Sequence, residues 1–152
     1  MTFTQTKHSP PKAPSALTAP SAPSVAPLKS AAETLLALSQ PVDKRHYKTI
    51  QKGHGEKAIS LEFIPWAVIC KCLHSRSPQW SFEITETKEL AGSVVVVGRL
   101  TIPTSDGLLN FSGVASERLD SGSMAPPVES AASSCLRRCA ALAGLGLDLY
   151  LN

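Results

Sequence analysis

The chain has 152 residues, with 15 basic and 12 acidic side chains and a formal net charge of +3 at pH 7. This length supplies one modest hydrophobic core rather than two. No stretch reaches the ~20 apolar residues that a membrane-spanning helix needs, so we expect no membrane partner. Four cysteines and no secretory signal pattern indicate free thiols in a reducing compartment.

Residues 1–29 differ in composition from the rest of the chain. They hold six of the twelve prolines, mixed with Ala, Ser and Thr, and three lysines, but no Arg and no acidic residue. Such a segment has few apolar groups to offset the entropy lost on ordering, which predicts a disordered Pro/Ala/Ser-rich tail. An organellar transit peptide is the alternative, which the missing acids favour and the missing Arg disfavours.

Residues 30–152 are predicted to form a single domain in which basic and acidic residues balance, so overall charge indicates no nucleic-acid partner. A short amphipathic helix starts this domain and ends before Pro41. Residues 43–55 are polar and basic, and we expect a helical turn or two followed by a loop. Residues 58–63 alternate between apolar and polar types, which predicts a half-buried strand.

A second helix and a three-stranded meander are predicted next. Pro65 suits the first position of a helix, and apolar residues follow it at helical spacing. Strands are predicted at 80–84, 93–102 and 108–115, separated by turns at 91–92 and 104–107. The continuously apolar run Val94–Val97 indicates either burial on both faces or a protected central position in the sheet.

The last predicted helix runs from Val128 and is capped by Gly144, because glycine readily takes a positive φ at a helix end. The predicted class is therefore α+β: helix–strand–helix, then an antiparallel β-meander, then a C-terminal helix packed on the sheet.

Nucleotide, metal and catalytic sites are not indicated. The segment 53–57 superficially resembles a phosphate loop but lacks the required spacing between its glycines and lysine. Cys70 and Cys72 lie about 200° apart on a helix, so a zinc site is disfavoured, and Cys135 and Cys139 are better explained as small apolar groups in a core. The four histidines are scattered, and no nucleophile sits in a recognisable motif. We expect a protein that is not an enzyme and needs no cofactor or metal.

Two basic clusters remain as candidates for binding phosphate. The first contains Lys44, Arg45, Lys48, Lys52 and Lys57, and the second is the pair Arg137 and Arg138. Solvated faces, or arginines that complement the negative end of a helix, explain both clusters equally well. Charge alone leaves the two interpretations open.

The C-terminal residues 135–150 read CLRRCAALAGLGLDLY. They resemble the closing helix of Rad fifty-two-like single-strand annealing proteins, which reads small–Leu–Lys–Arg–Ala–Ala, then aromatic–Gly–aliphatic–Gly, then Leu–Tyr, in the same register. Residues 63–69 and 80–84 look like the family's strand–helix–strand opening, and residues 98–102 look like its third strand. The resemblance covers roughly residues 40 to 152 and is closer to the bacterial and phage branch, including DdrA-like proteins.

Four positions depart from the family pattern. Ala143 stands where Phe is usual, Ala67 where a basic residue is common, and Asp148 where an aromatic is common. Arg137 replaces the usual Lys, which keeps the charge and adds a planar fork that grips phosphate with two bonds.

The resemblance implies a homo-oligomer, either a ring or a helical filament, that lays one DNA strand in a basic groove with its bases exposed. A complementary strand then pairs, and the pairing energy comes from the DNA, so neither ATP nor metal is needed. The implied function is single-stranded DNA binding and strand annealing in DNA recombination and repair, with replication or recombination proteins as possible partners. The expected DNA contacts are Arg137 and Arg138 from the motif, and Lys48, Lys52 and Lys57 from charge and position.

Two alternatives stay open. One is a binding module that protects DNA ends or recruits a partner without annealing. The other is a reader of double-stranded RNA, which shares the helix–meander–helix order but would want a basic start to its last helix, where this chain has residues 125–129, APPVE. The expected location is cytoplasmic and nucleoid-associated, with organellar targeting by the tail as the alternative.

Overall fold

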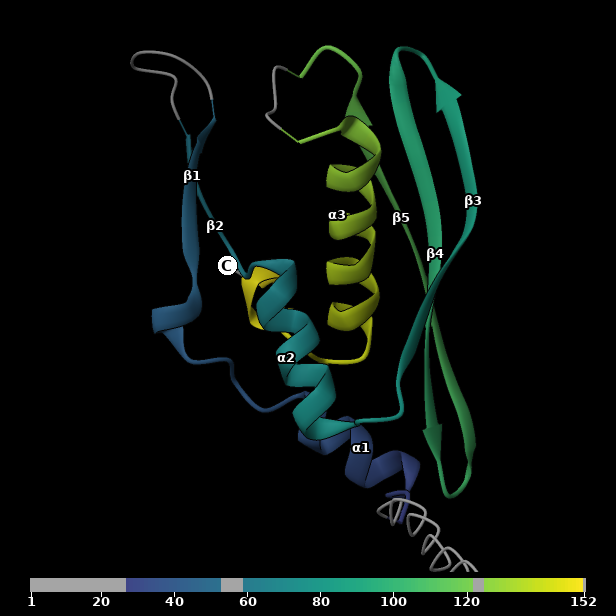
Figure 1. Cartoon of the computed structure of the whole chain (residues 1–152). Coiled ribbons are helices and arrows are strands. Elements are labelled where there is room, and N and C mark those ends of the chain that lie inside the picture. The colour runs from purple at the N-terminus through teal and green to yellow at the C-terminus, as the bar shows by residue number, and fades with distance from the viewer. Residues whose placement is uncertain (1–26, 53–58, 122–124, 152) are drawn as a thin grey trace, which may run out of the picture.

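A computed structural model describes residues 27–52, 59–121 and 125–151. In Figure 1 the long helix α3 stands between a three-stranded sheet on one side and a two-stranded hairpin on the other. The elements in chain order are α1 (Ala31–Leu38), η1 (Lys44–His46), β1 (Lys48–Lys52), β2 (Ile59–Phe63), α2 (Trp66–Arg76), β3 (Ser81–Leu90), β4 (Ser93–Thr104), β5 (Gly107–Arg118), α3 (Pro127–Leu142) and η3 (Leu147–Tyr150). The predicted α+β class, with a meander and a C-terminal helix on the sheet, is confirmed.

The meander is antiparallel in the order β3–β4–β5, so β4 is its central strand. Alternate residues of β4 are buried on the face that α3 covers, including Val94, Val96 and Leu100. Val95 and Val97 lie on the other face and keep part of their surface exposed. The central position, one of the two predicted explanations, accounts for the apolar run, and burial on both faces does not.

Two glycines allow α3 to lie close to the sheet. Gly98 of β4 and Gly113 of β5 are directly opposite one another in the antiparallel register. A Cβ added at Gly113 would lie 2.9 Å from the Cys139 sulfur, and one added at Gly98 would lie 3.0 Å from the Cys135 sulfur. Both thiols are fully buried, so their predicted role as small apolar core groups is confirmed.

The two shorter helices close the end of the core. Ser30 caps α1 in a reciprocal capping box with Glu33. In α2, Ile69 and Leu73 are buried, and Arg76 at its end donates hydrogen bonds to the backbone carbonyls of Leu38, Gln40 and Pro41. No helix within the described ranges is long and apolar enough to cross a bilayer.

The region between α1 and α2 differs from the prediction. Where one or two helical turns were predicted, the structure has only the short helix η1. Where a loop was predicted, it has strand β1, which pairs antiparallel with β2. The sequence KTIQK has one apolar residue, so its own pattern does not show a strand, and pairing with β2 decides its conformation. Strand β2 is mostly exposed rather than half-buried, because the hairpin β1–β2 forms a separate sheet.

Strand β3 is also longer than predicted and extends to Leu90. Its charged second half lies at the edge of the sheet, where charges discourage pairing with other chains. Before α1, the Lys29 carbonyl accepts a hydrogen bond of 2.9 Å from the Ser105 amide. Residues 1–26 lie outside the described part, and the tail boundary at residue 29 stays a prediction.

Candidate nucleic-acid interface

A groove of about 760 Å³ lies between the hairpin β1–β2 and the N-terminal half of α3. In Figure 1 the hairpin lies on the side of α3 that faces away from the three-stranded sheet. The residues that line the groove are Ile50, Gln51, Leu61, Glu62, Phe63, Trp66, Glu117, Ser121, Ala125, Glu129, Ser130, Ser133, Ser134 and Arg137. We call this space the hairpin groove.

The α3 wall of the hairpin groove is polar. Ser130, Ser133, Ser134 and Arg137 recur at i, i+3, i+4 and i+7, so they share one face of the helix. This wall presents hydroxyl groups and one guanidinium, all of which donate hydrogen bonds. The same spacing can be read from the sequence, but the prediction for this helix was based on its apolar stripe and on the Arg137–Arg138 pair and did not include the serines.

Arg137 is partly buried where β2 approaches α3. Its guanidinium carbon lies 5.4 Å from the centre of the Phe63 ring, a cation–π arrangement, and its Nη2 donates to the Ser134 hydroxyl at 2.8 Å. Burial lowers the pKa of Arg137, yet a guanidinium stays charged at neutral pH. Among the ion pairs of the described residues, none involves Arg137. A desolvated cation without a carboxylate partner is a natural receptor for an anion.

Arg138 takes a different direction. It is exposed, and its Nη1 donates to the Val114 backbone carbonyl of β5 at 2.8 Å. Adjacent residues on a helix point about 100° apart, and here that angle sends Arg137 toward the hairpin and Arg138 toward the sheet. The structure therefore does not bring the two guanidiniums together in one cluster.

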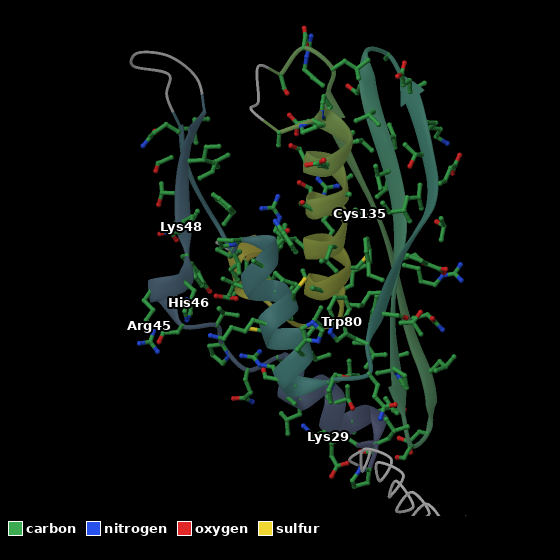
Figure 2. All side chains as sticks on the ribbon, viewed as in Figure 1. Lys29, Arg45, His46, Lys48, Trp80 and Cys135 are labelled. Carbon is green, nitrogen blue, oxygen red and sulfur yellow. The ribbon has the colours of Figure 1, made fainter. Side chains whose placement is uncertain are left out.

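Two of the three lysine candidates, Lys48 and Lys52, belong to strand β1 of the hairpin. Lys48 is exposed and begins β1 directly opposite Phe63, so the register puts both residues on the same face of the hairpin. Figure 2 shows Lys48 at the base of the hairpin, near Arg45, whose side chain is paired with Asp43 at 2.8 Å. Lys52 ends β1 opposite Ile59 in the backbone register. Lys57 lies outside the described residues.

Three acidic residues also line the hairpin groove and divide it electrostatically. Glu117 comes near the end of β5, and Glu129 sits in the first turn of α3, where it complements the helix dipole. Glu62 precedes Phe63 on β2. Glu117 and Glu129 both belong to the end near the start of α3, which disfavours a phosphate there, whereas Glu62 lines a smaller cavity together with Phe63 and Arg137 and places one carboxylate at the Arg137 end.

The wall opposite α3 carries exposed apolar residues beside Gln51 and Glu62, and the sequence did not predict them. Trp66 was expected at a helix position facing the core, but it is 54 % exposed and lines the groove. Ile50 and Leu61 face each other across the β1–β2 ladder and are also exposed. The only sequence signal was an aromatic directly after Pro65, which a core position explains equally well.

Metal and thiol chemistry find no support in this geometry. No three His, Cys, Asp or Glu side chains of the described ranges gather as a metal site. Burial, then the neighbouring Cys135, raises the pKa of the Cys139 thiol to about 11, which leaves it protonated at neutral pH. Protonated, buried thiols are poor nucleophiles and poor metal ligands.

The fold and groove together define an α+β protein with a groove beside a hairpin, whose lining contains one guanidinium, Arg137, and the three carboxylates named above. No family model matches the sequence. The chain is similar to the DNA repair RAD52-like protein 1, mitochondrial, of Arabidopsis thaliana, with 25% identity over 126 residues, covering 82% of this chain and 72% of that protein.

A second relative is the DNA repair RAD52-like protein 2, chloroplastic, also of Arabidopsis thaliana. It is 30% identical over 120 residues, which cover 76% of this chain but only 60% of that protein. Both similarities support the Rad fifty-two-like resemblance, and both relatives are named as DNA repair proteins. They do not bear on the bacterial and phage, DdrA-like branch, which stays a prediction.

Proposed function

We propose that this chain is a Rad fifty-two-like protein that binds single-stranded DNA and anneals complementary strands without ATP, metal or catalysis. The observation that carries the proposal is Arg137: a partly desolvated guanidinium, held on Phe63 and facing a groove, with no carboxylate pair among the described residues. Both named relatives are DNA repair proteins.

Phosphate is the anion that this site suits best. The guanidinium fork matches two phosphate oxygens, and such charge-assisted hydrogen bonds are about twice as strong as neutral ones. Ser133 and Ser134 on the same helix face add neutral donors beside it. Lys48, on the hairpin face that carries Phe63, supplies a second cation. Lys52 and Lys57 remain candidates on the basis of charge and position. Arg138 remains a candidate from the motif, and we expect it to contribute less than Arg137 because its guanidinium is directed to the sheet.

A homo-oligomer, as a ring or helical filament, is part of the proposal because annealing needs many nucleotides held at once. The sheet face opposite α3 supports it: Val97 and Val114 are cross-strand neighbours there, and Val114 is 48 % exposed. A second copy of the chain would cover such an apolar face. Light scattering should give a mass of several chains at micromolar concentration, and a monomer mass with and without DNA would contradict this part.

The test of function is an annealing assay. Two complementary oligonucleotides, one with a fluorophore and one with a quencher, are mixed with the protein in buffer that contains EDTA and no nucleotide. The expected result is pairing several-fold faster than the protein-free rate, with Arg137→Ala slower than wild type. Binding of oligo-dT without faster pairing would favour the alternative, a module that protects DNA ends or recruits replication or recombination proteins. Absence of oligo-dT binding would overturn the proposal.

The cellular compartment is a separate part of the proposal. The two relatives are named as mitochondrial and chloroplastic, which favours the organellar alternative over a cytoplasmic, nucleoid-associated location. Residues 1–29 lack acidic side chains, as transit peptides do. A fluorescent protein fused behind residues 1–29 should enter an organelle of plant cells. A diffuse cytoplasmic signal would contradict organellar targeting and favour the cytoplasmic location.

A further inference from the structure

The two walls of the hairpin groove differ in chemistry. The α3 wall offers the Arg137 guanidinium and serine hydroxyls, with Glu129 at its far end. The opposite wall offers Ile50, Leu61 and Trp66, with Gln51 and Glu62 as its polar members. A single DNA strand has the same division along its length, with anionic phosphates on one side and apolar base faces on the other. Duplex DNA does not, because its base faces are stacked on one another.

Resting on the function proposed above, we propose that Trp66 stacks on a nucleobase of the bound strand while a phosphate of that strand binds Arg137 on α3. Trp66 is the first residue of α2, immediately after Pro65, so its position is fixed at a helix start. One helical turn later Ile69 is fully buried, which anchors α2 in the core. The residue Trp66 is 54 % exposed and lines the groove.

The unpaired cation decides between possible occupants of this apolar wall. An apolar peptide would cover Ile50, Leu61 and Trp66, but it would also bury Arg137 without giving it an anion. A nucleotide provides both an aromatic face for the indole and a phosphate for the guanidinium. One Trp66 in each chain holds one base and leaves its neighbours free to pair with a complementary strand.

Stacking makes a prediction that phosphate binding does not. Base–aromatic stacking contributes roughly 5- to 150-fold in affinity for each base and tolerates every base type. Trp66→Ala should therefore weaken oligo-dT binding by a factor in that range with no change in the salt dependence, since no charge is lost. Trp66→Phe keeps a ring and should retain most of the affinity. Arg137→Ala should also weaken binding, but unlike Trp66→Ala it should flatten the salt dependence.

Two probes separate stacking from a structural role. The first is an abasic oligonucleotide with the same number of phosphates as the oligo-dT. If Trp66 stacks on bases, Trp66→Ala weakens oligo-dT binding but leaves binding of the abasic strand at its wild-type value. Equal weakening of both strands would mean that Trp66 only supports the fold, and this would overturn the inference.

The second probe is the fluorescence of Trp66 itself. The chain has two tryptophans, and Trp80 is half-buried with its indole N–H bonded to His74 Nδ1 at 3.1 Å. A Trp80→Phe variant leaves Trp66 as the single emitter, and oligo-dT should quench it. In the matched Trp66→Phe variant, the remaining Trp80 emission should change little.

The outcomes distinguish this inference from the function on which it depends. Wild-type protein that fails to bind oligo-dT would remove the proposed function. Wild-type protein that binds, with affinity and emission both independent of Trp66, would leave the function standing and overturn the stacking. A third outcome is that Trp66 emits like a buried indole before DNA is added and that Trp66→Ala loses the oligomer. This outcome would mean that Trp66 contacts a second copy of the chain, and it would also overturn the stacking inference.

Discussion

Replacing Arg137 by Ala tests whether the groove binds phosphate, and the structure gives the expected magnitudes. In the folded protein the change removes a cation–π contact with Phe63, about 0.5–1 kcal/mol, and a hydrogen bond to Ser134, about 1 kcal/mol. Relief of the desolvated charge offsets part of that loss. We therefore expect the free energy of unfolding to fall by about 1 kcal/mol or less and the variant to stay folded.

The effect on DNA binding should be larger. A hydrogen bond to a charged group contributes about 1.5–3 kcal/mol, so the loss of one phosphate contact weakens oligo-dT binding roughly 10- to 150-fold. The slope of log affinity against log salt concentration should fall in magnitude by about 0.7, the value for one contact on a single strand. Every base sequence should be affected alike, because phosphates carry no base identity.

Arg138→Ala is the matched control, since it removes the same charge one residue away. Its guanidinium already donates to the Val114 carbonyl and is directed to the sheet, so the salt slope should stay nearer to that of wild type. Fluorescence anisotropy with oligo-dT at several salt concentrations measures both variants, and circular dichroism checks the fold. A folded Arg137→Ala protein with wild-type affinity and slope would refute the phosphate site, and a larger loss in Arg138→Ala would refute the assignment of the groove.

Three further predictions concern the framework. Gly113→Ala places a methyl group 2.9 Å from the Cys139 sulfur, so the free energy of unfolding in urea should fall by about 1–3 kcal/mol, and adding Cys139→Ala should restore part of it. Tyr47→Phe loses a 2.7 Å hydrogen bond to Asp148 and should cost about 1 kcal/mol. Burial and then Asp148 raise the pKa of Tyr47 to about 12, above its usual value near 10. The stabilisation from this hydroxyl is therefore complete below pH 10 and should be lost as the pH rises toward 12. Tyr47→Phe, which lacks the hydroxyl, should not show this loss of stability. Removing residues 1–26 should leave the melting temperature unchanged, because their composition offers no periodic apolar face.

The sequence predicts the meander and α3 well because their signals are local. The β-branched apolar run of β4, the turn at Ala91–Gly92 and the glycine after α3 are each local signals, and the structure agrees at all three places. Gly144 has φ of 98°, a value that side-chain-bearing residues rarely adopt. The buried state of Cys135 and Cys139 also follows from helical spacing alone.

The hairpin could not be predicted in the same way. Strand β1 has a weak pattern of its own and exists because β2 pairs with it. The hairpin is tied to the end of the chain by the Tyr47–Asp148 hydrogen bond, between residues 101 positions apart. Asp148 looked like a loss of the family's aromatic residue, whereas in the structure it accepts the Tyr47 hydroxyl. Because the groove depends on contacts between residues far apart in the chain, no single segment of the sequence has a pattern that predicts it.

Arg137 illustrates why a binding site and a stable core place opposite demands on one residue. Its desolvation disfavours the folded state, and an acidic partner would relieve that cost but would also compete with phosphate. Phe63 and Ser134 instead stabilise the guanidinium without neutralising it, since an aromatic face and a hydroxyl carry no net charge. The guanidinium therefore keeps its positive charge without a carboxylate partner, and a phosphate that binds there supplies the missing anion. The arrangement explains why a resemblance of sequence pointed to the pair Arg137–Arg138, while only the packing of β2 against α3 singles out Arg137.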